Sequence, residues 1–241
     1  NCKYINFQIR DRHIPEDIEK FSSFIVKLSN IINLLEKDRY IYIHCRGGHG
    51  RAGIVVSCLL CYMYNYTSQE SLKKTNLYHN NRRIMNEKWR TIGSPQTENQ
   101  KNFVRRLFKP VFIDNIHNKN TYYNLNNQSN HHISYNNKNY RNINICYYCI
   151  KYPILYNTLI NCKNYYEFKN IINIQEYKTE YSVDQLTKIM KQIIQYKVKT
   201  FNDIENLLIR TFLRPIVYTH DNINIGKIYS DIRHHLYLNY S

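Results

Sequence analysis

The chain of 241 residues is 43% hydrophobic, which is enough for the packed core of one large domain or two small ones. It has no apolar run long enough to cross a bilayer, and its first residues lack the charged and apolar zones of a signal peptide, which argues against membrane insertion and secretion. With 34 Lys and Arg against 18 Asp and Glu, the formal charge of +16 favours phosphorylated or acidic partners or nucleic acid, without choosing among them.

The cysteines indicate an intracellular protein. Seven of them are scattered without regular spacing, which predicts reduced thiols and a cytoplasmic or nuclear location. Cys146 and Cys149 have the spacing of half a zinc site, but no second pair follows, so the sequence predicts neither a metal nor a cofactor. The chain starts at Asn1 without a methionine, and we expect the protein to continue upstream of it.

The first predicted elements are two strands with a helix between them. Residues 4–9 alternate apolar and polar side chains, the period of a strand with one buried face. Pro15 and the acidic residues after it suit the first turn of a helix, whose apolar spacing continues to about Glu36. Residues 40–44 are a short β-rich run that predicts a central strand.

Three helices are predicted to follow a glycine-rich loop. Residues 52–64 are apolar on nearly every side, which suits a helix in the centre of a domain. Thr67 and Glu70 form a capping-box pattern that opens the next helix. Ser94 and Pro95 mark the start of the last helix, which Pro110 stops. The order of elements predicts an α/β fold, with a sheet flanked by helices.

The second half of the chain has a different composition. Asn, His, Tyr and Ser dominate residues 114–142, which predicts a flexible linker. Capping-box patterns at Ser182 with Gln185 and at Asn202 with Glu205 predict helices over about 183–196 and 203–212. We therefore expect a catalytic domain over residues 1–112, a linker over 113–142 and a small, mostly helical domain over 143–241.

Residues 44–53 carry the strongest chemical signal. They read His-Cys-Arg-Gly-Gly-His-Gly-Arg-Ala-Gly, and they hold four of the six glycines of the chain. Glycines let the backbone turn tightly and direct consecutive N–H groups inward, which makes a nest for a phosphate group. A helix that starts directly afterwards adds the positive end of its dipole. The predicted phosphate-binding residues are Arg46, Gly47, Gly48, His49, Gly50 and Arg51.

Cys45 and Arg51 fit this nest as a nucleophile and a phosphate clamp. The donors that bind phosphate also stabilise a thiolate, so we expect the pKa of Cys45 to lie below the ~8.5 of a free thiol. Arg51 is six residues further on, and its guanidinium can offer two parallel donors to the phosphate oxygens. Because charge develops on those oxygens in phosphoryl transfer, the arrangement stabilises the transition state.

His-Cys followed by five residues and Arg, between a predicted strand and a buried helix, resembles the signature of the protein tyrosine phosphatase superfamily. The resemblance is closest to dual-specificity members and spans about residues 4–108. It implies hydrolysis of phosphotyrosine, and in dual-specificity members of phosphoserine and phosphothreonine, in protein substrates. It also implies strands ahead of the acid loop that the first ten residues do not supply. One residue departs from the pattern: the family has Ser or Thr after the Arg, whose hydroxyl helps the Cys sulfur to leave, whereas this chain has Ala52.

Further roles follow from the same resemblance. Asp11, between a predicted strand and helix, is the candidate general acid. Gln96 and Gln100 lie in a segment similar to the one at which related phosphatases begin their last helix, and Gln96 is the candidate for placing the hydrolytic water. His44 is expected to orient the loop and to tune the pKa of the Cys.

The sequence leaves other functions open. Ala52 and the short start leave open a phosphate-binding pseudoenzyme with little turnover. Basic Arg46 and His49 leave open a phosphoinositide phosphatase, and the positive charge suits an RNA 5′-triphosphatase. The order of residues over about 183–238, including Lys197 and Asp221, resembles the NADAR family, which acts on N-glycosidic bonds, but it assigns no catalytic residue here.

Overall fold

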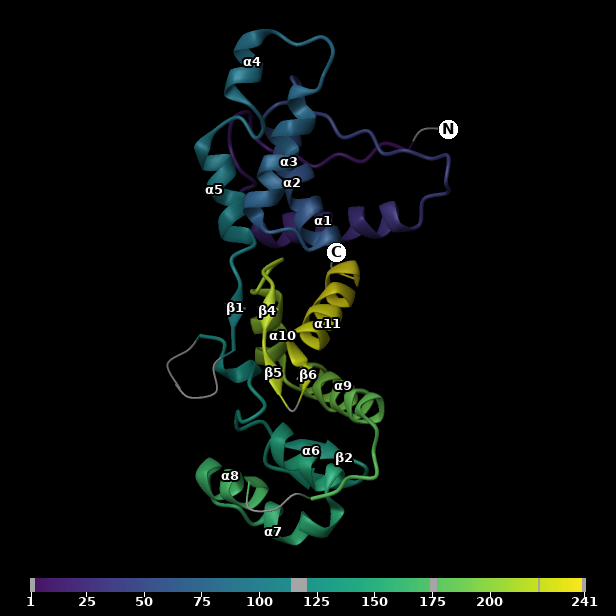
Figure 1. Cartoon of the computed structure of the whole chain (residues 1–241), viewed down its shortest axis with the longest axis vertical. Coiled ribbons are helices and arrows are strands. Elements are labelled where there is room, and N and C mark those ends of the chain that lie inside the picture. The colour runs from purple at the N-terminus through teal and green to yellow at the C-terminus, as the bar shows by residue number, and fades with distance from the viewer. Residues whose placement is uncertain (1–2, 114–120, 174–176, 221, 240–241) are drawn as a thin grey trace. The chain divides into compact units, whose positions relative to one another are not determined.

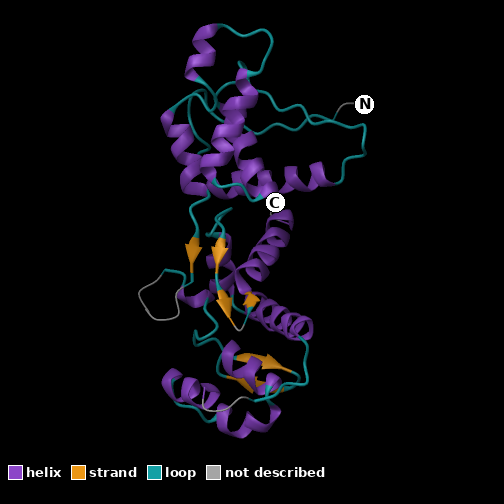
Figure 2. Ribbon diagram, viewed as in Figure 1, coloured by secondary structure: helices purple, strands orange, loops and turns teal. Residues whose placement is uncertain are grey.

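The computed structural model describes residues 3–113, 121–173, 177–220 and 222–239. The chain divides into two compact units, which are described separately. The first comprises Asn1–Pro110, Phe212–Pro215 and His234–Ser241, and the second comprises Val111–Thr211 and Ile216–Arg233. Figure 2 shows that helices dominate and that the strands are short, so the mixed α/β class is confirmed. No helix in the described residues is both long and apolar enough to cross a membrane.

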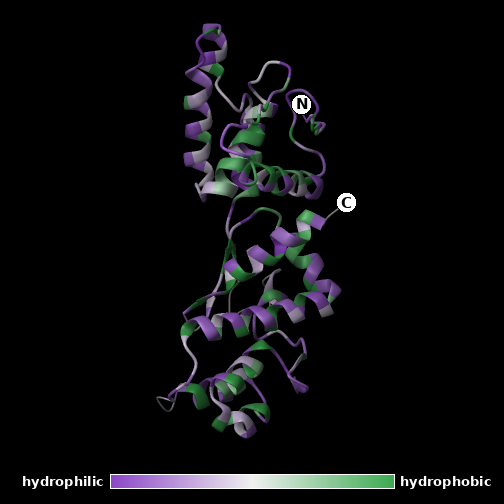
Figure 3. Cartoon of the chain, turned by 90° about the vertical axis from the view of Figure 1, so that its right-hand side faces the viewer, coloured by the Kyte–Doolittle hydropathy of each residue, from purple (hydrophilic) through white to green (hydrophobic). Residues whose placement is uncertain are grey.

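The first unit contains helices α1 to α5, with α2 at its centre (Figure 1). Helix α2 packs against α1, α3 and α5, and it is buried along much of its length. Figure 3 shows hydrophobic colour where the helices of this unit face one another and hydrophilic colour on their outer surfaces. The helices are α1 (Ile18–Asn33), α2 (Arg51–Tyr64), α3 (Ser68–Asn80), α4 (Glu87–Ile92) and α5 (Glu98–Leu107).

Two kinds of contact hold these helices together. Phe21 of α1 makes an edge-to-face contact with Phe103 of α5, with ring centroids 5.5 Å apart. Between α2 and α3 the contacts are polar and fully buried: Ser57 donates to Thr75 at 2.9 Å, and Ser71 donates to the Ser57 carbonyl at 2.6 Å. Since these buried hydroxyls are paired, their hydrogen bonds offset the cost of desolvation and fix how α3 lies along α2.

The two strands expected in the first unit are not formed. Residues 4–9 and 40–44 have no strand assignment, and within the described residues all strands belong to the second unit. The expectation of a buried central strand fails most clearly at Tyr40 and Tyr42, which are 89% and 86% exposed. The alternating pattern favours an extended backbone, but a strand also needs a hydrogen-bonded neighbour, and the described part of this unit provides none.

The helix starts confirm some capping predictions and correct others. Thr67 with Glu70 and Ser182 with Gln185 form the predicted capping boxes. The last helix of the first unit begins later than expected, because Thr97 rather than Ser94 accepts from the backbone and forms a capping box with Gln100. The Asn202 capping box is absent, since Asn202 is already helical after Phe201. Helix α4 was not predicted from the sequence.

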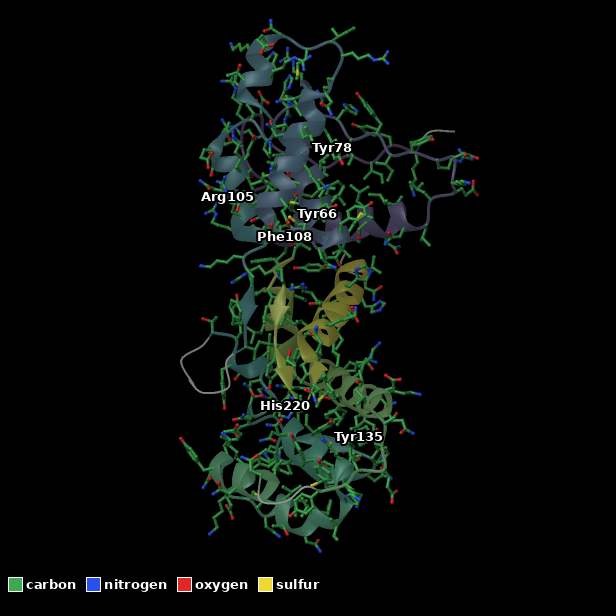
Figure 4. The ribbon with its side chains drawn as sticks, viewed as in Figure 1. Tyr66, Tyr78, Arg105, Phe108, Tyr135 and His220 are labelled. Atoms are coloured by element: carbon green, nitrogen blue, oxygen red, sulfur yellow. The ribbon has the colours of Figure 1, made fainter. Side chains whose placement is uncertain are left out.

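The second unit consists of helices with three two-stranded pairings. Strand β1 pairs in parallel with β4, while β2 pairs with β3 and β5 with β6 in antiparallel fashion. Tyr135 of β2, labelled in Figure 4, donates to Gln192 of α9 at 2.7 Å and so ties the β2–β3 hairpin to that helix. The strands are β1 (Val111–Phe112), β2 (Ile133–Tyr135), β3 (Lys138–Tyr140), β4 (Ile216–Val217), β5 (Thr219–His220) and β6 (Ile223–Asn224). The helices are η1 (Tyr123–Leu125), α6 (Ile143–Lys151), η2 (Pro153–Leu155), α7 (Tyr156–Ile160), α8 (Tyr165–Asn173), α9 (Val183–Thr200), α10 (Asn202–Ile209) and α11 (Ile225–Asn239), whose residues from His234 onward belong to the first unit.

The linker expectation is wrong for residues 121–142, which fold into η1, β2 and β3; residues 114–120 lie outside the described residues. This Asn-rich segment is held by a buried lysine. The ammonium group of Lys197 donates to the carbonyls of Asn124 and Asn126, at 2.5 and 3.0 Å, and to the Ser129 hydroxyl at 2.7 Å. Lys197, Asn126 and Ser129 are all buried. Hydrogen bonds therefore order a stretch that hydrophobicity alone does not predict to fold.

Candidate active site

The glycine-rich segment forms a tight loop at the start of α2. Gly48 has a φ of 69°, a left-handed conformation that favours glycine, and its N–H donates to the Cys45 sulfur at 3.2 Å. Arg51 is the first residue of α2 and Gly50 caps it, so the positive end of the helix lies at the loop. Backbone donors thus face the Cys45 sulfur, which is half-buried rather than directed into the core, as the prediction of a nest requires.

The electrostatics of the loop favour a thiolate. Partial burial acts to raise the pKa of Cys45, but the backbone N–H groups of Ala52, Gly48 and Gly47 and the charge of Arg51 act against it, and the net result is a lowered pKa. The other described cysteines behave in the opposite way. Burial raises the pKa of Cys61 to about 11 and that of Cys149 to about 12. Among the described cysteines, Cys45 is therefore the one whose thiol pKa is lowered.

The structure brings Asp11 to Arg51, the predicted phosphate clamp. Nη2 of Arg51 lies 3.0 Å from a carboxylate oxygen of Asp11, and Nη1 donates to the Ile9 carbonyl at 3.3 Å. The Asp11 side chain is 72% exposed, so it is open to a ligand from solvent. Next to it, Arg12 adopts a left-handed φ of 61° and His13 contacts the Asp11 carbonyl at 2.7 Å, which gives this loop a defined turn. The predicted acid thus lies on a loop beside Arg51, the first residue of the helix that follows the loop of Cys45.

Gln100 has a supporting position instead of one facing a ligand. It is fully buried, its side-chain oxygen accepts from the N–H groups of Gln96 and Thr97, each at 3.1 Å, and its NH2 donates to the His13 carbonyl at 3.1 Å. Its amide also fills the space where a side chain at Gly50 would lie. Gln100 therefore links α5, the phosphate loop and the loop of Asp11. The Gln96 side chain is half-buried and makes no hydrogen bond within the described part of the chain.

Three further predicted site residues differ in their surroundings. Arg46 is exposed at the surface of the loop. His44 is also exposed, stacks on Tyr42 and lies 3.4 Å from the Cys45 carbonyl through Nδ1, so it contacts the loop backbone and not the sulfur. Ala52 is buried, and its N–H faces the Cys45 sulfur where the resemblance leads one to expect a hydroxyl side chain as well.

A set of contacts around His49 was not predicted. The His49 ring stacks on Trp89, with centroids 4.6 Å apart, and its Nδ1 lies 2.7 Å from Nε2 of His79. The Ser94 hydroxyl donates to the His49 carbonyl at 2.6 Å, and Arg82 donates to the Gly48 carbonyl at 2.9 Å. The segment between α3 and α5 thus forms one wall of the loop. Trp89, the one tryptophan of the chain, was the available signal, but nothing in the sequence showed which residue it contacts.

The described side chains show no clustered ligands for a metal ion. Within the described residues, no group of three or more His, Cys, Asp or Glu side chains is arranged to hold a metal ion. Cys146 and Cys149 are buried on α6, and burial raises the pKa of both thiols, which disfavours the thiolate form that binds zinc.

Comparisons with known proteins point to the same region. The family model described as Swiss Army Knife protein, DSP-PTPase phosphatase domain, matches residues 2–104. A protein named "Putative tyrosine phosphatase 197R", from Invertebrate iridescent virus 6, is 41% identical over 113 residues, which are 47% of this chain and 37% of that protein. "Putative tyrosine phosphatase 067L", from Invertebrate iridescent virus 3, is 37% identical over 106 residues, 44% of each chain.

These matches have a limited extent. The aligned part spans less than half the length of either viral relative, and no solved structure matches the chain. None of the comparisons supports the NADAR resemblance of residues 183–238.

Proposed function

We propose, from the premise that residues 2–104 form a domain of the protein tyrosine and dual-specificity phosphatase superfamily, that this domain hydrolyses phosphotyrosine in proteins through a cysteinyl-phosphate intermediate. The observation that carries the proposal is the thiol of Cys45, whose pKa is lowered by backbone N–H groups and by Arg51 at the mouth of a half-buried loop. Phosphoserine and phosphothreonine are further substrates if the domain is of the dual-specificity kind.

In the first step the Cys45 thiolate attacks phosphorus. A sulfur–phosphorus bond forms, the bond from phosphorus to the leaving oxygen breaks, and the carboxylic acid of Asp11 gives its proton to that oxygen. Arg51 and the loop N–H groups bind the remaining phosphate oxygens, on which charge develops. Without a ligand, Arg51 pairs with Asp11 at 3.0 Å. A substrate dianion would replace Asp11 as the partner of Arg51 and so free the acid for the leaving group.

In the second step water attacks the cysteinyl phosphate. The sulfur–phosphorus bond breaks, Asp11 takes a proton from the water, and inorganic phosphate leaves with the thiolate restored. Gln96 is the candidate to position this water, since its side chain is half-buried and makes no other hydrogen bond within the described residues. Gln100 does not take this role, because its amide is buried and already bonded to His13, Gln96 and Thr97.

The test is hydrolysis of p-nitrophenyl phosphate and of a phosphotyrosine peptide by the full chain and by Cys45→Ser. We expect turnover in the former and none in the latter, because a serine hydroxyl is not ionised at neutral pH. Cys162→Ser is a matched control, since this thiol lies in the second unit, where it contacts the Thr158 carbonyl. Turnover that survives in Cys45→Ser would refute the assignment, and Cys162→Ser should keep the turnover of the unchanged chain.

A second candidate, a phosphate-binding pseudophosphatase, is favoured by one observation. Ala52 offers the sulfur a backbone N–H but no hydroxyl, so the cysteinyl phosphate would break down slowly. In that case a phosphotyrosine peptide would bind, or would label Cys45 with one equivalent of phosphate, without continued release. Assays of a phosphoinositide and of triphosphorylated RNA beside the peptide would separate the remaining substrate classes.

A further inference from the structure

A hydrogen bond between two imidazole rings connects helix α3 to the phosphate loop. Nδ1 of His49, in the loop, lies 2.7 Å from Nε2 of His79, in the last turn of α3. His79 is 4% exposed, and its own Nδ1 lies 3.0 Å from Oδ1 of Asn80. A buried side chain that is 30 positions away in the sequence therefore reaches the loop.

The neighbour of the pair fixes the direction of this hydrogen bond. The Asn80 amide oxygen can only accept, so Nδ1 of His79 carries a proton and Nε2 of the neutral ring is an acceptor. Nδ1 of His49 is then the donor. Burial lowers the pKa of both rings, most strongly among the effects on each, so both are mostly neutral at neutral pH. A neutral pair is the state in which one ring donates and the other accepts.

The hydrogen bond adds what the other contacts of His49 do not supply. The ring stacks on Trp89 with centroids 4.6 Å apart and an interplanar angle of 11°. Stacking holds a ring in a plane but leaves it free to turn within that plane, whereas a hydrogen bond is directional. A Cβ added to Gly47 would lie 2.8 Å from Cδ2 of the His49 ring, so the ring lies directly against the loop backbone. His79 therefore sets the rotation of a ring that supports Gly47.

The loop has few other side chains by which it can be held. His49 is the one residue of the stretch from Gly47 to Gly50 that is not glycine, and glycine backbone is the most free to turn. Gly48, directly before His49, has a φ of 69° and donates its N–H to the Cys45 sulfur at 3.2 Å. This N–H and that of Gly47 are among the groups that lower the pKa of Cys45. An anchor at His49 thus bears on the donors that face the sulfur.

We propose that His79 is a positioning residue of the phosphate loop, which accepts a hydrogen bond from His49 and so holds the Gly48 N–H toward the Cys45 sulfur. The proposal rests on the phosphatase function given above and adds to it a residue that acts through His49 and not on the phosphate group. It makes the acceptor at position 79, and not the bulk of the ring, the feature that matters.

Two substitutions separate the acceptor from the bulk. His79→Phe keeps a buried ring without an acceptor, whereas His79→Gln places an amide oxygen near the position of Nε2. For p-nitrophenyl phosphate we expect kcat to fall about tenfold in His79→Phe, with KM little changed, and to stay within about threefold in His79→Gln. His132→Phe is the control, since His132 is exposed and lies in the second unit. If His79→Phe is as active as His79→Gln, the ring only fills space and the proposal fails.

A double-mutant cycle tests whether His79 acts through His49. His49→Phe keeps a ring that can stack on Trp89 but removes the donor. Each single substitution should cost about tenfold in kcat, and the two together should also cost about tenfold, because they remove the same hydrogen bond. A combined loss of about a hundredfold would show that the two rings act separately and would overturn the proposal.

Alkylation of Cys45 by iodoacetamide tests the proposal without turnover. The rate over a range of pH, with the modified residue identified by mass spectrometry, gives the pKa of this thiol. His79→Phe should move the midpoint of the curve upward by about half a pH unit, and His79→Gln should leave it in place. His49→Phe removes the same bond from a half-buried position and gives the same test if His79→Phe does not fold.

Failure of the positioning role and failure of the phosphatase function are therefore distinguishable. An unchanged midpoint in folded His79→Phe or His49→Phe would refute the positioning role, whether or not the chain hydrolyses a phosphate ester. A shifted midpoint in a chain that hydrolyses no substrate would support the positioning role and refute the phosphatase function alone.

Discussion

The phosphate loop of the first unit and the Lys197 cluster of the second are both organised by a cation, but they use it differently. Arg51 pairs with an exposed carboxylate and one carbonyl, contacts that a phosphate group replaces in the proposed function. Lys197 is fully buried and gives its three N–H donors to Asn124, Asn126 and Ser129. The Ser129 hydroxyl in turn donates to the same two carbonyls, so the cluster is closed.

This difference shows that a shifted pKa alone does not identify a functional group. Burial lowers the pKa of Lys197 to about 7, against a small contrary effect of Asp203, yet no side of the ammonium group is open to a ligand. The pKa of Cys45 is also lowered, but its sulfur is half-buried and faces the backbone donors of the proposed phosphate loop. Accessibility and replaceable partners separate a reactive group from one that holds the fold.

The largest effect is expected for Arg51→Lys. An ammonium group keeps the charge but loses the two parallel donors, so kcat/KM for p-nitrophenyl phosphate should fall about 10³-fold while the melting temperature stays nearly unchanged. Steady-state kinetics and a thermal melt on the same sample measure both. Arg83→Lys serves as the control, because Arg83 is exposed. A loss below about tenfold would mean that Arg51 is not the phosphate clamp. The contrast between a functional Arg51 and a structural Lys197 would then fail.

Lys197→Met should show the opposite pattern. The substitution leaves buried carbonyl oxygens and the Ser129 hydroxyl without their cationic donor, at an expected cost of about 2 kcal/mol in the free energy of unfolding. Phosphatase kcat/KM should be unchanged while the protein is folded. Denaturant unfolding followed by circular dichroism gives the first quantity and p-nitrophenyl phosphate the second. Loss of turnover in a stable Lys197→Met protein would show that the cluster is more than structural.

Features that depend on a short stretch of chain could be predicted from the sequence, whereas features that depend on distant residues could not. The loop from His44 to Gly53, its place before a helix and the capping box at Thr67 are contained in short stretches, and the structure has them. The strands at 4–9 and 40–44 failed because a strand requires a partner that its own sequence does not encode. Arg82 was missed for a similar reason: its contact with Gly48 spans 34 positions and follows no spacing rule.

In the second unit, too, a contact between residues far apart in the sequence could not be predicted. A lysine at position 197 of an amphipathic helix predicts a surface residue, because lysine is rarely buried. Its burial depends on carbonyls and a hydroxyl from 68 to 73 positions away, in a segment whose composition predicts disorder. Polar groups that satisfy one another fold without the hydrophobic pattern on which sequence-based prediction depends.

The pH dependence of the free energy of unfolding tests whether the pKa of Lys197 is lowered by burial. Because its folded-state pKa of about 7 lies below the unfolded value near 10.5, the unfolded chain binds more protons between these values, and stability should rise with pH across that window. From pH 7 to pH 8 the expected rise is about 1 kcal/mol. Denaturant midpoints of the full chain and of Lys197→Met, taken at both pH values, isolate this contribution by subtraction. Equal slopes in the two proteins would show that Lys197 does not titrate in this range.

The smallest effect is expected at Ala52. It tests whether the loop lacks a hydroxyl donor that would speed the breakdown of the cysteinyl phosphate. Ala52 is buried with its N–H toward the Cys45 sulfur, so Ala52→Ser would add a hydroxyl donor close to the leaving thiolate. Such a donor acts when the sulfur–phosphorus bond breaks, and it should raise the steady-state rate by a few-fold while the formation of the cysteinyl phosphate changes little. Pre-steady-state release of p-nitrophenol separates the two steps: the full chain should show a burst that Ala52→Ser reduces. If the full chain shows no burst and Ala52→Ser is no faster, breakdown of the intermediate is not limiting, and the backbone donors of the loop suffice to stabilise the departing sulfur.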